Sequence, residues 1–280
     1  MKSAGSVAVI GLGLIGGSVA RCLAARGIPV LGYDSNPSHL DAAISEGVVS
    51  RRLSPGLEDI GDAETVVIAV YGDSVFDVLR SIEQHSTAAQ LVTDVGSTKR
   101  SIVSAAVRLG LGPRFVGSHP FSGDHRSGWA ASRMDLFEGA TVYLCPAADT
   151  LPTTFALARQ LWMSLGAKPE VIDAGAHDDL LAWSSHLPQL VSTALALALA
   201  DAGITRRQLG RGGHDVTRLA AGSPNVWTAV ALDNAPAIEA AVSAVQRELE
   251  LFRETLRRGD ARALSQRFAK ACDWSVRVDD

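Results

Sequence analysis

The segment Val7-Ala8-Val9-Ile10-Gly11-Leu12-Gly13-Leu14-Ile15-Gly16 is the clearest indication of fold class in this chain. Its first four residues form an apolar run typical of a buried strand, and the glycine-rich segment after it opens a helical pattern. Gly11 and Gly13 allow a tight turn and a close approach of the backbone to a pyrophosphate, and Gly16 lets the helix pack on the strand. The helix N-terminus offers free N–H groups to phosphates. We therefore expect a dinucleotide-binding loop made by Gly11, Gly13, Leu14, Ile15 and Gly16.

The residue that ends the next predicted strand, Asp34, indicates which dinucleotide binds. It lies 18 residues after Gly16, directly behind the apolar run 30–33. A carboxylate there accepts hydrogen bonds from a ribose diol and repels a 2′-phosphate, so NAD is favoured over NADP. Val70, at the end of a further predicted strand over 65–70, is assigned to the same cofactor site.

Around this loop, strand and helix patterns alternate along the chain. Strands rich in Val and Ile are predicted at 7–10, 30–33, 65–70, 90–94, 115–117, 141–145 and 170–172. Helices are predicted between them at 16–26, 37–46, 75–81, 100–109 and 153–165. That rhythm is typical of crossover connections in a mostly parallel sheet. The sequence thus predicts a Rossmann-type α/β domain over residues 1–173.

Beyond the last predicted strand, the pattern indicates an all-helical domain over residues 174–280. A long helix is predicted over 176–202, kinked by Pro188 near Ser184 and ended by Gly203.

A second long helix, over 236–258, carries apolar residues at alternating spacings of four and three. This stripe fits either an internal core or a seam between subunits. We favour a substrate-binding domain that forms a homodimer, because a small domain has limited core in which to bury so much apolar surface.

Composition excludes several classes of protein. Hydrophobic residues make up 47% and charged residues 20% of the 280 residues, as in ordinary globular proteins. The formal charge of −4 gives no reason to expect a nucleic-acid partner. Cys22, Cys145 and Cys272 suit a reducing compartment and lack metal-ligand spacing, so no metal is expected.

No membrane segment is expected either. The apolar start is broken by glycines and lacks the pattern of a signal peptide. The longest uncharged stretch, 180–200, includes His186, Pro188 and Gln189, and is better explained as a buried interface helix. We therefore predict a cytoplasmic protein. Small basic clusters such as Lys99-Arg100 are expected on solvated faces.

The segment 117–124, Gly-Ser-His-Pro-Phe-Ser-Gly-Asp, presents a candidate catalytic histidine. His119 follows a predicted strand, and Gly117 and Pro120 suggest that a stiff turn holds its ring. A lone histidine in a turn is more often structural than catalytic. Ser97 shifts that balance, because it follows the neighbouring predicted strand and should emerge at the same sheet edge. Its hydroxyl can orient the imidazole there and contact the substrate.

Further candidates lie in the second half of the chain. His186 and Gln189 are three residues apart on one helix face. His177 lies nine residues before His186, on the opposite side of a straight helix, so we interpret it as structural. Arg218 follows a glycine loop and can bind a carboxylate through two parallel hydrogen bonds. The alternative for Arg218 is a surface salt bridge with Asp215.

Five segments in this order and spacing resemble the prephenate/arogenate dehydrogenase family of tyrosine biosynthesis, over nearly the whole chain. They are GLGLIGGS from residue 11, DVGSTK from 94, GSHPFSGD from 117, HDDLLAWSSHLPQLVSTAL from 177 and GGHDVTRLAAGSPNVW from 212. The resemblance implies oxidation of a cyclohexadienol with NAD(P)+ coupled to loss of the ring carboxylate as CO2. It also implies a Rossmann-type domain followed by an all-helical dimerisation domain.

The resemblance also implies roles for single residues. His119 would accept a hydrogen bond from the substrate hydroxyl, with Ser97 beside it and the nicotinamide. Arg218 would bind a substrate carboxylate, with His186 and Gln189 also in the substrate site. Asp215 would join an ionic network near the active-site entrance.

Two departures from the family pattern bear on the substrate. Many members have a histidine where this chain has Gln189, and that histidine is associated with prephenate recognition. Asp124 stands where Thr or Ser is common. Asp124 adds a carboxylate and Gln189 removes a group that can be positively charged, and both changes suit the ammonium group of L-arogenate. The alternative is that Asp124 simply pairs with His125, Arg126 or Arg133. We favour L-arogenate slightly over prephenate.

Two other functions remain open alternatives. A β-hydroxyacid or 6-phosphogluconate-type dehydrogenase shares the two-domain plan but needs a lysine on the first long helix of its second domain. No lysine occurs between Lys168 and Lys270. A non-catalytic nucleotide-sensing protein would not need Ser97, His119 and Arg218 together.

Overall fold

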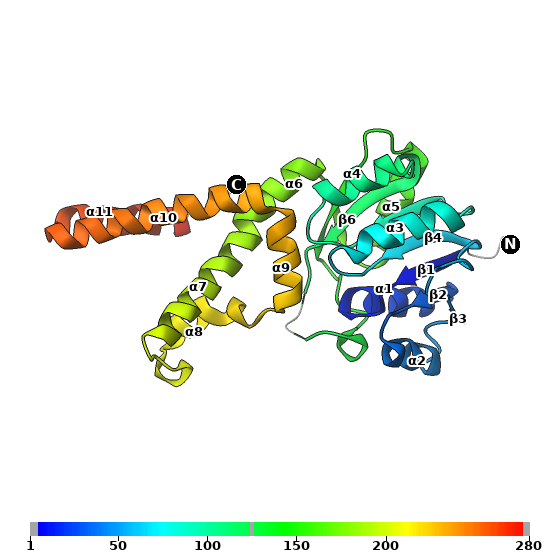
Figure 1. Cartoon of the computed structure of the whole chain (residues 1–280), viewed down its shortest axis with the longest axis horizontal. Helices are drawn as coiled ribbons and strands as arrows, with labels where there is room; N and C mark the ends of the chain where they lie inside the picture. The colour runs from blue at the N-terminus through cyan, green and yellow to red at the C-terminus, as the bar shows by residue number, and fades with distance from the viewer. Residues whose placement is uncertain (1–4, 124–125, 277–280) are drawn as a thin grey trace. The chain divides into compact units, whose positions relative to one another are not determined.

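A computed structural model describes residues 5–123 and 126–276 of the chain (Figure 1). An eight-stranded sheet has the order β3-β2-β1-β4-β5-β6-β7-β8, and all its neighbouring strands are parallel except β6 and β7, which are antiparallel. The strands are β1 (Ser6–Ile10), β2 (Val30–Tyr33), β3 (Arg51–Arg52), β4 (Ala63–Ile68), β5 (Leu91–Asp94), β6 (Phe115–Pro120), β7 (Thr141–Pro146) and β8 (Lys168–Val171). The mostly parallel α/β sheet predicted from the sequence is confirmed.

Helices cover both faces of this sheet (Figure 1). They are α1 (Leu14–Ala24), α2 (Pro37–Ser45), α3 (Ser74–His85), α4 (Arg100–Arg108) and α5 (Pro152–Ser164). Side chains of β1 alternate between the two cores: Val7 and Val9 pack with α1, α2 and α5, whereas Ala8 and Ile10 pack with α3 and α4. This period of two is what a strand buried on both faces requires.

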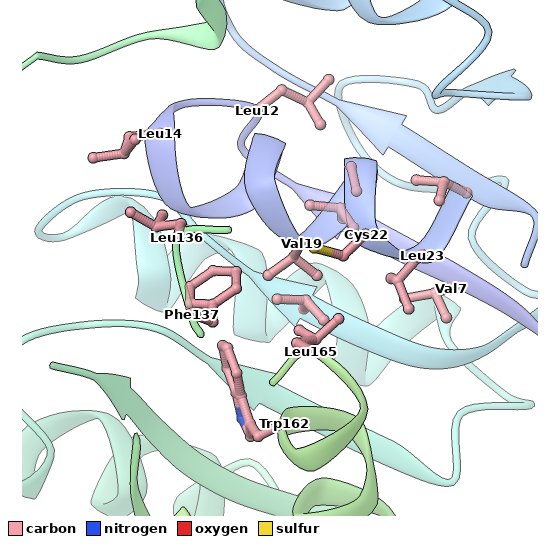
Figure 2. Close-up of a cluster of buried hydrophobic side chains, with 14 of the residues drawn as sticks. Val7, Leu12, Leu14, Val19, Cys22, Leu23, Leu136, Phe137, Trp162 and Leu165 are labelled. Carbon is pink, nitrogen blue, oxygen red and sulfur yellow. The ribbon is translucent and has the colours of Figure 1, made fainter. Parts of the chain in front are cut away.

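Figure 2 shows the core beneath α1, where Val19, Cys22 and Leu23 lie near Phe137 and Trp162. The rings of Phe137 and Trp162 meet edge to face with centroids 5.4 Å apart. The indole N–H of Trp162 donates to the Ser118 hydroxyl at 2.9 Å, so the core also holds the strand that carries His119.

After β8 the described residues form helices and turns. The helices are α6 (Ala174–Leu181), α7 (Leu187–Asp201), α8 (Arg211–Thr217), α9 (Pro224–Asp233), α10 (Ala235–Arg258) and α11 (Ala261–Val276). A π-helical turn, Ala182–His186, joins α6 to α7 just before Pro188, where the kink was predicted. Gly203, at φ +72°, follows the end of α7 as expected.

The chain divides into two compact units that meet between Asn234 and Ala235. The second unit is the helix pair α10 and α11, in which Arg267 bonds to Glu248 at 2.7 Å and Phe252 contacts Phe268 with ring centroids 5.6 Å apart. The boundary predicted after residue 173 marks the change to all-helical structure; as a division into domains it stays a prediction. Among the described residues, no helix is long and apolar enough to cross a membrane.

Candidate active site

The loop after β1 has the geometry of a phosphate cradle. Gly11 has φ +97°, and a Cβ added there would lie 2.3 Å from the Ala69 carbonyl oxygen. A Cβ on Gly16 would lie 1.9 Å from the Gly11 oxygen, so only glycine fits at either position. A Cβ on Gly13 would meet nothing nearer than 3.7 Å. Packing does not require glycine at position 13. A glycine there leaves the N-terminus of α1 open, so that a phosphate group can approach its backbone N–H groups.

The other predicted cofactor residues surround this loop. Asp34 directly follows β2, and its carboxylate accepts the N–H of Leu12 at 2.6 Å and that of Asn36 at 2.7 Å. A carboxylate offers about four lone-pair sites, so capacity remains for a ribose diol. Leu14 is buried, whereas Ile15 and Val70 are half-buried beside the loop. These residues fit a dinucleotide in the crevice between β1 and β4, where the strand order reverses.

His119 lies inside a strand, which corrects the prediction of a stiff turn. β6 runs on to Pro120, and His119 pairs with Tyr143 of the antiparallel strand β7. The parallel neighbour β5 ends at Asp94, so β7 alone supplies ladder partners to this part of β6. Antiparallel pairing therefore extends the strand past the sheet edge and fixes the histidine backbone.

A chain of polar contacts reaches the His119 ring from α6. Its Nδ1 lies 2.9 Å from Nε2 of His177, and Nδ1 of His177 lies 2.8 Å from Oδ1 of Asp178. The Asp178 carboxylate in turn accepts the backbone N–H groups of Lys99 and Arg100 at the start of α4. His177 is fully buried. It is thus part of the site, and the interpretation of His177 as structural overlooked this contact.

The surroundings of His119 favour its neutral form. Burial lowers the pKa of His119 well below its ordinary value of 6.5, and the charge of Lys99, with any positive charge on His177 or His186, lowers it further. Only 8% of the residue is exposed. An unprotonated imidazole at neutral pH is what a general base requires.

Lys99 contributes one of these charges from inside the core. Its side chain is completely buried and ion-paired with Asp94, which corrects the expectation of a solvated basic cluster. Asp94 also accepts the N–H of Gly96 at 2.8 Å and that of Ser118 at 3.3 Å. The pair therefore ties the end of β5 to β6, the strand that carries His119.

His186 lies in the π-helical turn, buried beside Asn234 and Trp227. Its Nδ1 is 3.3 Å from the Asn234 amide nitrogen, which also donates to the Asp178 carbonyl at 2.7 Å. Nε2 of His186 has no partner among the described residues. Burial lowers the pKa of His186 to about 4, against the opposing effect of the Asp178 charge. His186 is thus a neutral ring at neutral pH, and its Nε2 has no hydrogen-bond partner among the described residues.

The Gln189 side chain bonds to the backbone of the turn that begins with Arg218. The Gln189 amide donates to the carbonyl of Leu219 at 2.8 Å, and the Ser192 hydroxyl accepts the N–H of Ala220 at 3.2 Å. Both bonds hold the 3-10 turn Arg218–Ala221, so Gln189 supports the arginine that the sequence assigned to a carboxylate.

Four predicted site residues are not joined to this arrangement by a side-chain bond between described residues, or lie outside the described residues. The Arg218 and Asp215 side chains are exposed, and within the described ranges no ion pair joins them. Ser97 is half-buried past the end of β5, at the same edge as His119, with no side-chain hydrogen bond to a described residue. Asp124 lies outside the described residues.

The sequence missed His177, Lys99 and Trp227 as parts of the site. Trp227 packs edge to face on His186, with centroids 6.2 Å apart. For His177, the signal was the adjacent Asp178, since a carboxylate beside an imidazole is the usual way to fix a histidine tautomer. Within the described ranges, no group of His, Cys, Asp and Glu could hold a metal ion.

Comparisons with known proteins identify the family of this chain. Residues 19–171 match a family profile described as prephenate dehydrogenase, nucleotide-binding domain, and residues 173–270 match its dimerization domain. The prephenate dehydrogenase of Bacillus subtilis is 30% identical over 96% of this chain and 75% of the relative.

Solved structures give the same result. A prephenate dehydrogenase from A. aeolicus, in complex with hydroxyphenyl propionate and NAD+, superposes with a TM-score of 0.89 at 27% identity, covering 98% of both chains. Synechocystis arogenate dehydrogenase gives 0.80 at 27% identity, over 97% of this chain and 100% of that one. The two profiles together span most of the sequence, and this chain belongs to the prephenate dehydrogenase family.

Proposed function

We propose that the protein oxidises and decarboxylates a cyclohexadienol, prephenate or L-arogenate, with NAD+ as the hydride acceptor. The observation that carries this proposal is the buried His119, which lies at the same edge of the sheet as the dinucleotide loop and in surroundings that lower its pKa. The hydroxyl of the substrate must lose its proton as its ring carbon becomes a carbonyl. A positioned base of this kind contributes about 10²–10⁴-fold to the rate.

Each residue of the candidate site has its own role in this reaction. Bound NAD+ supplies the acceptor for the hydride that leaves the carbon bearing the hydroxyl. His119 takes the hydroxyl proton, and Arg218 binds a substrate carboxylate through its guanidinium. Loss of the ring carboxylate as CO2 leaves its electron pair in the ring, and the phenol oxygen of the product takes the proton back. Ser97, His186, Gln189 and Asp215 complete the substrate site.

Cofactor choice and assembly belong to the same proposal. Asp34 favours NAD over NADP, because its charge repels a 2′-phosphate. The exposed apolar residues of α10 and α11, including Leu249, Leu256 and Phe268, support a homodimer. The free thiols of the three cysteines are consistent with the reducing cytoplasm. The preference for L-arogenate stays a prediction that rests on Gln189 and Asp124.

The decisive experiment follows cofactor reduction with each substrate. Purified protein is mixed with NAD+ or NADP+ and with prephenate or L-arogenate, and absorbance of the reduced cofactor is recorded. Turnover of either substrate, faster with NAD+, is the expected result. Inactivity with both substrates would reject the proposed function, and turnover of prephenate alone would reject the L-arogenate preference.

The pH dependence tests the neutral state of His119. We expect the acidic limb of kcat/KM to lie below pH 6.5, because the pKa of His119 is lowered from that value and only its unprotonated form accepts a proton. Loss of activity already between neutral pH and 6.5 would contradict this. Unfolding must be monitored in parallel. The unfolded chain binds protons at ordinary histidine pKa values, so burial of His119 and His186 makes stability fall as pH drops below 6.5.

Replacing Arg218 should weaken substrate binding. The side chain is exposed, so Arg218→Gln is expected to fold normally and to raise KM about 10–100-fold by removing a charge-assisted carboxylate contact. Steady-state kinetics with the accepted substrate measure this. Arg211→Gln, a neighbouring exposed arginine on α8, is the matched control, and equal KM values in both variants would refute the assigned role.

A further inference from the structure

We propose that His177 and Asp178 fix the tautomer of His119, so that Nδ1 of His119 carries its proton and Nε2 is the atom that accepts the substrate proton. His177 and Asp178 are then positioning residues, and neither touches the substrate. The kinetic consequence rests on the proposed function, but the tautomer itself can be observed without turnover.

The Asp178 carboxylate sets the direction of the hydrogen bonds that lead to His119. It is nearly completely buried and accepts two backbone N–H groups at the start of α4, that of Lys99 at 2.8 Å and that of Arg100 at 2.9 Å. Burial alone would raise the pKa of Asp178, but the bond from His177 and these backbone donors lower it below its ordinary value. An ionised carboxylate can only accept hydrogen bonds. The group 2.8 Å away, Nδ1 of His177, must therefore donate.

The proton on Nδ1 of His177 determines what its Nε2 offers to His119. A neutral imidazole carries one proton, so His177 with its proton on Nδ1 presents a lone pair at Nε2. That lone pair faces Nδ1 of His119 at 2.9 Å. The opposite tautomer of His119 would oppose two lone pairs at this distance and leave buried acceptors unsatisfied. His119 therefore donates from Nδ1, and its Nε2 is unprotonated.

Packing keeps this chain from rearranging. The rings of His119 and His177 meet edge to face with centroids 5.1 Å apart, and Tyr143 packs against His177 at 5.5 Å. The charged and titratable groups near His119 come from other elements: Lys99 with its partner Asp94, and His186 in the π-helical turn. Lys99 is committed to Asp94, so the His177 ring is the partner that sets the tautomer of His119.

Nitrogen NMR of the protein without substrate tests the tautomer directly. Histidine is labelled with 15N, and the His119 signals are identified by their loss in His119→Asn. Protonated and unprotonated ring nitrogens have well-separated shifts. The expected result is a protonated Nδ1 and an unprotonated Nε2 in His119 at neutral pH. The reverse assignment, or a mixture of tautomers, would overturn the proposal.

Two substitutions of His177 provide a matched pair. The amide of Gln reaches the place of Nε2, so His177→Gln keeps an acceptor for His119 and gives up the contact with Asp178. The amide of the shorter Asn reaches only the place of Nδ1, so His177→Asn keeps the contact with Asp178 and loses the acceptor for Nδ1 of His119. We expect His177→Asn to lower kcat by about 10²-fold with KM changed less than about threefold, and His177→Gln to stay within about tenfold of wild type.

The outcomes separate this proposal from the proposed function. Equal losses of kcat in the Gln and Asn variants would overturn the positioning role, because they would point to packing alone. Thermal unfolding and cofactor titration show whether each variant is folded. If the unchanged protein turns over neither substrate, the proposed function fails, while the NMR assignment still decides which nitrogen of His119 carries the proton.

Discussion

The variant His119→Asn is expected to lose a factor of about 10²–10⁴ in kcat while binding the cofactor as tightly as the unchanged protein. The Asn amide nitrogen takes the place of Nδ1 and can still donate to Nε2 of His177, which lies 2.9 Å from the native ring. The variant therefore removes one function, the acceptor atom on the substrate side, and leaves the buried partner satisfied. Initial rates of cofactor reduction at saturating substrate measure the loss.

A histidine elsewhere in the chain provides the control. His85 ends α3 and lies outside the polar chain around His119, so His85→Asn should leave kcat unchanged. Cofactor affinity, measured by fluorescence titration, should be the same in both variants. Activity of His119→Asn close to that of wild type would remove His119 from the mechanism and transfer the proton to another acceptor.

The part of this site that could be predicted from the sequence is the part encoded locally. Strand β1, the glycine loop and Asp34 follow one another within a single crossover unit, so period, turn chemistry and spacing suffice to predict them. The end of β6 is different. Residues 118–120 are strand only because β7, more than twenty residues later, pairs antiparallel with them. A long-range pairing of this kind leaves no local pattern, and the sequence therefore predicted a turn at His119.

Two further errors have the same origin in tertiary structure. The angle between His177 and His186 was inferred from a uniform α-helix, but the π-helical turn Ala182–His186 changes the rotation per residue between them. Lys99 was expected in solvent because lysines usually are. Its burial depends on Asp94, which is close in sequence, and on α4, β6 and α6 packing over the pair. Spacing alone could not reveal that enclosure.

Asp94→Asn is expected to lower the free energy of unfolding by about 3–5 kcal/mol, because it leaves the ammonium of Lys99 buried without a counter-charge. Asn keeps the size of the side chain and one acceptor oxygen. Because Gly96 donates to Oδ2 and Ser118 to Oδ1 of Asp94, the variant also loses one of these two backbone bonds. The lost charge is still the larger change, because it leaves a buried ammonium without a partner. Urea denaturation at neutral pH, analysed at constant m-value, measures the loss.

Burial, rather than the ion pair as such, should decide the size of this effect. Asp41 is paired with Arg52 in solvent, so Asp41→Asn should cost less than about 1 kcal/mol. The double variant Asp94→Asn/Lys99→Met should recover most of the lost stability, since Met fills a similar volume to Lys99 and no unpaired charge then remains buried. If Asp94→Asn were as mild as Asp41→Asn, the buried ammonium of Lys99 would not need its counter-charge, and the predicted contribution of the ion pair to stability would be refuted.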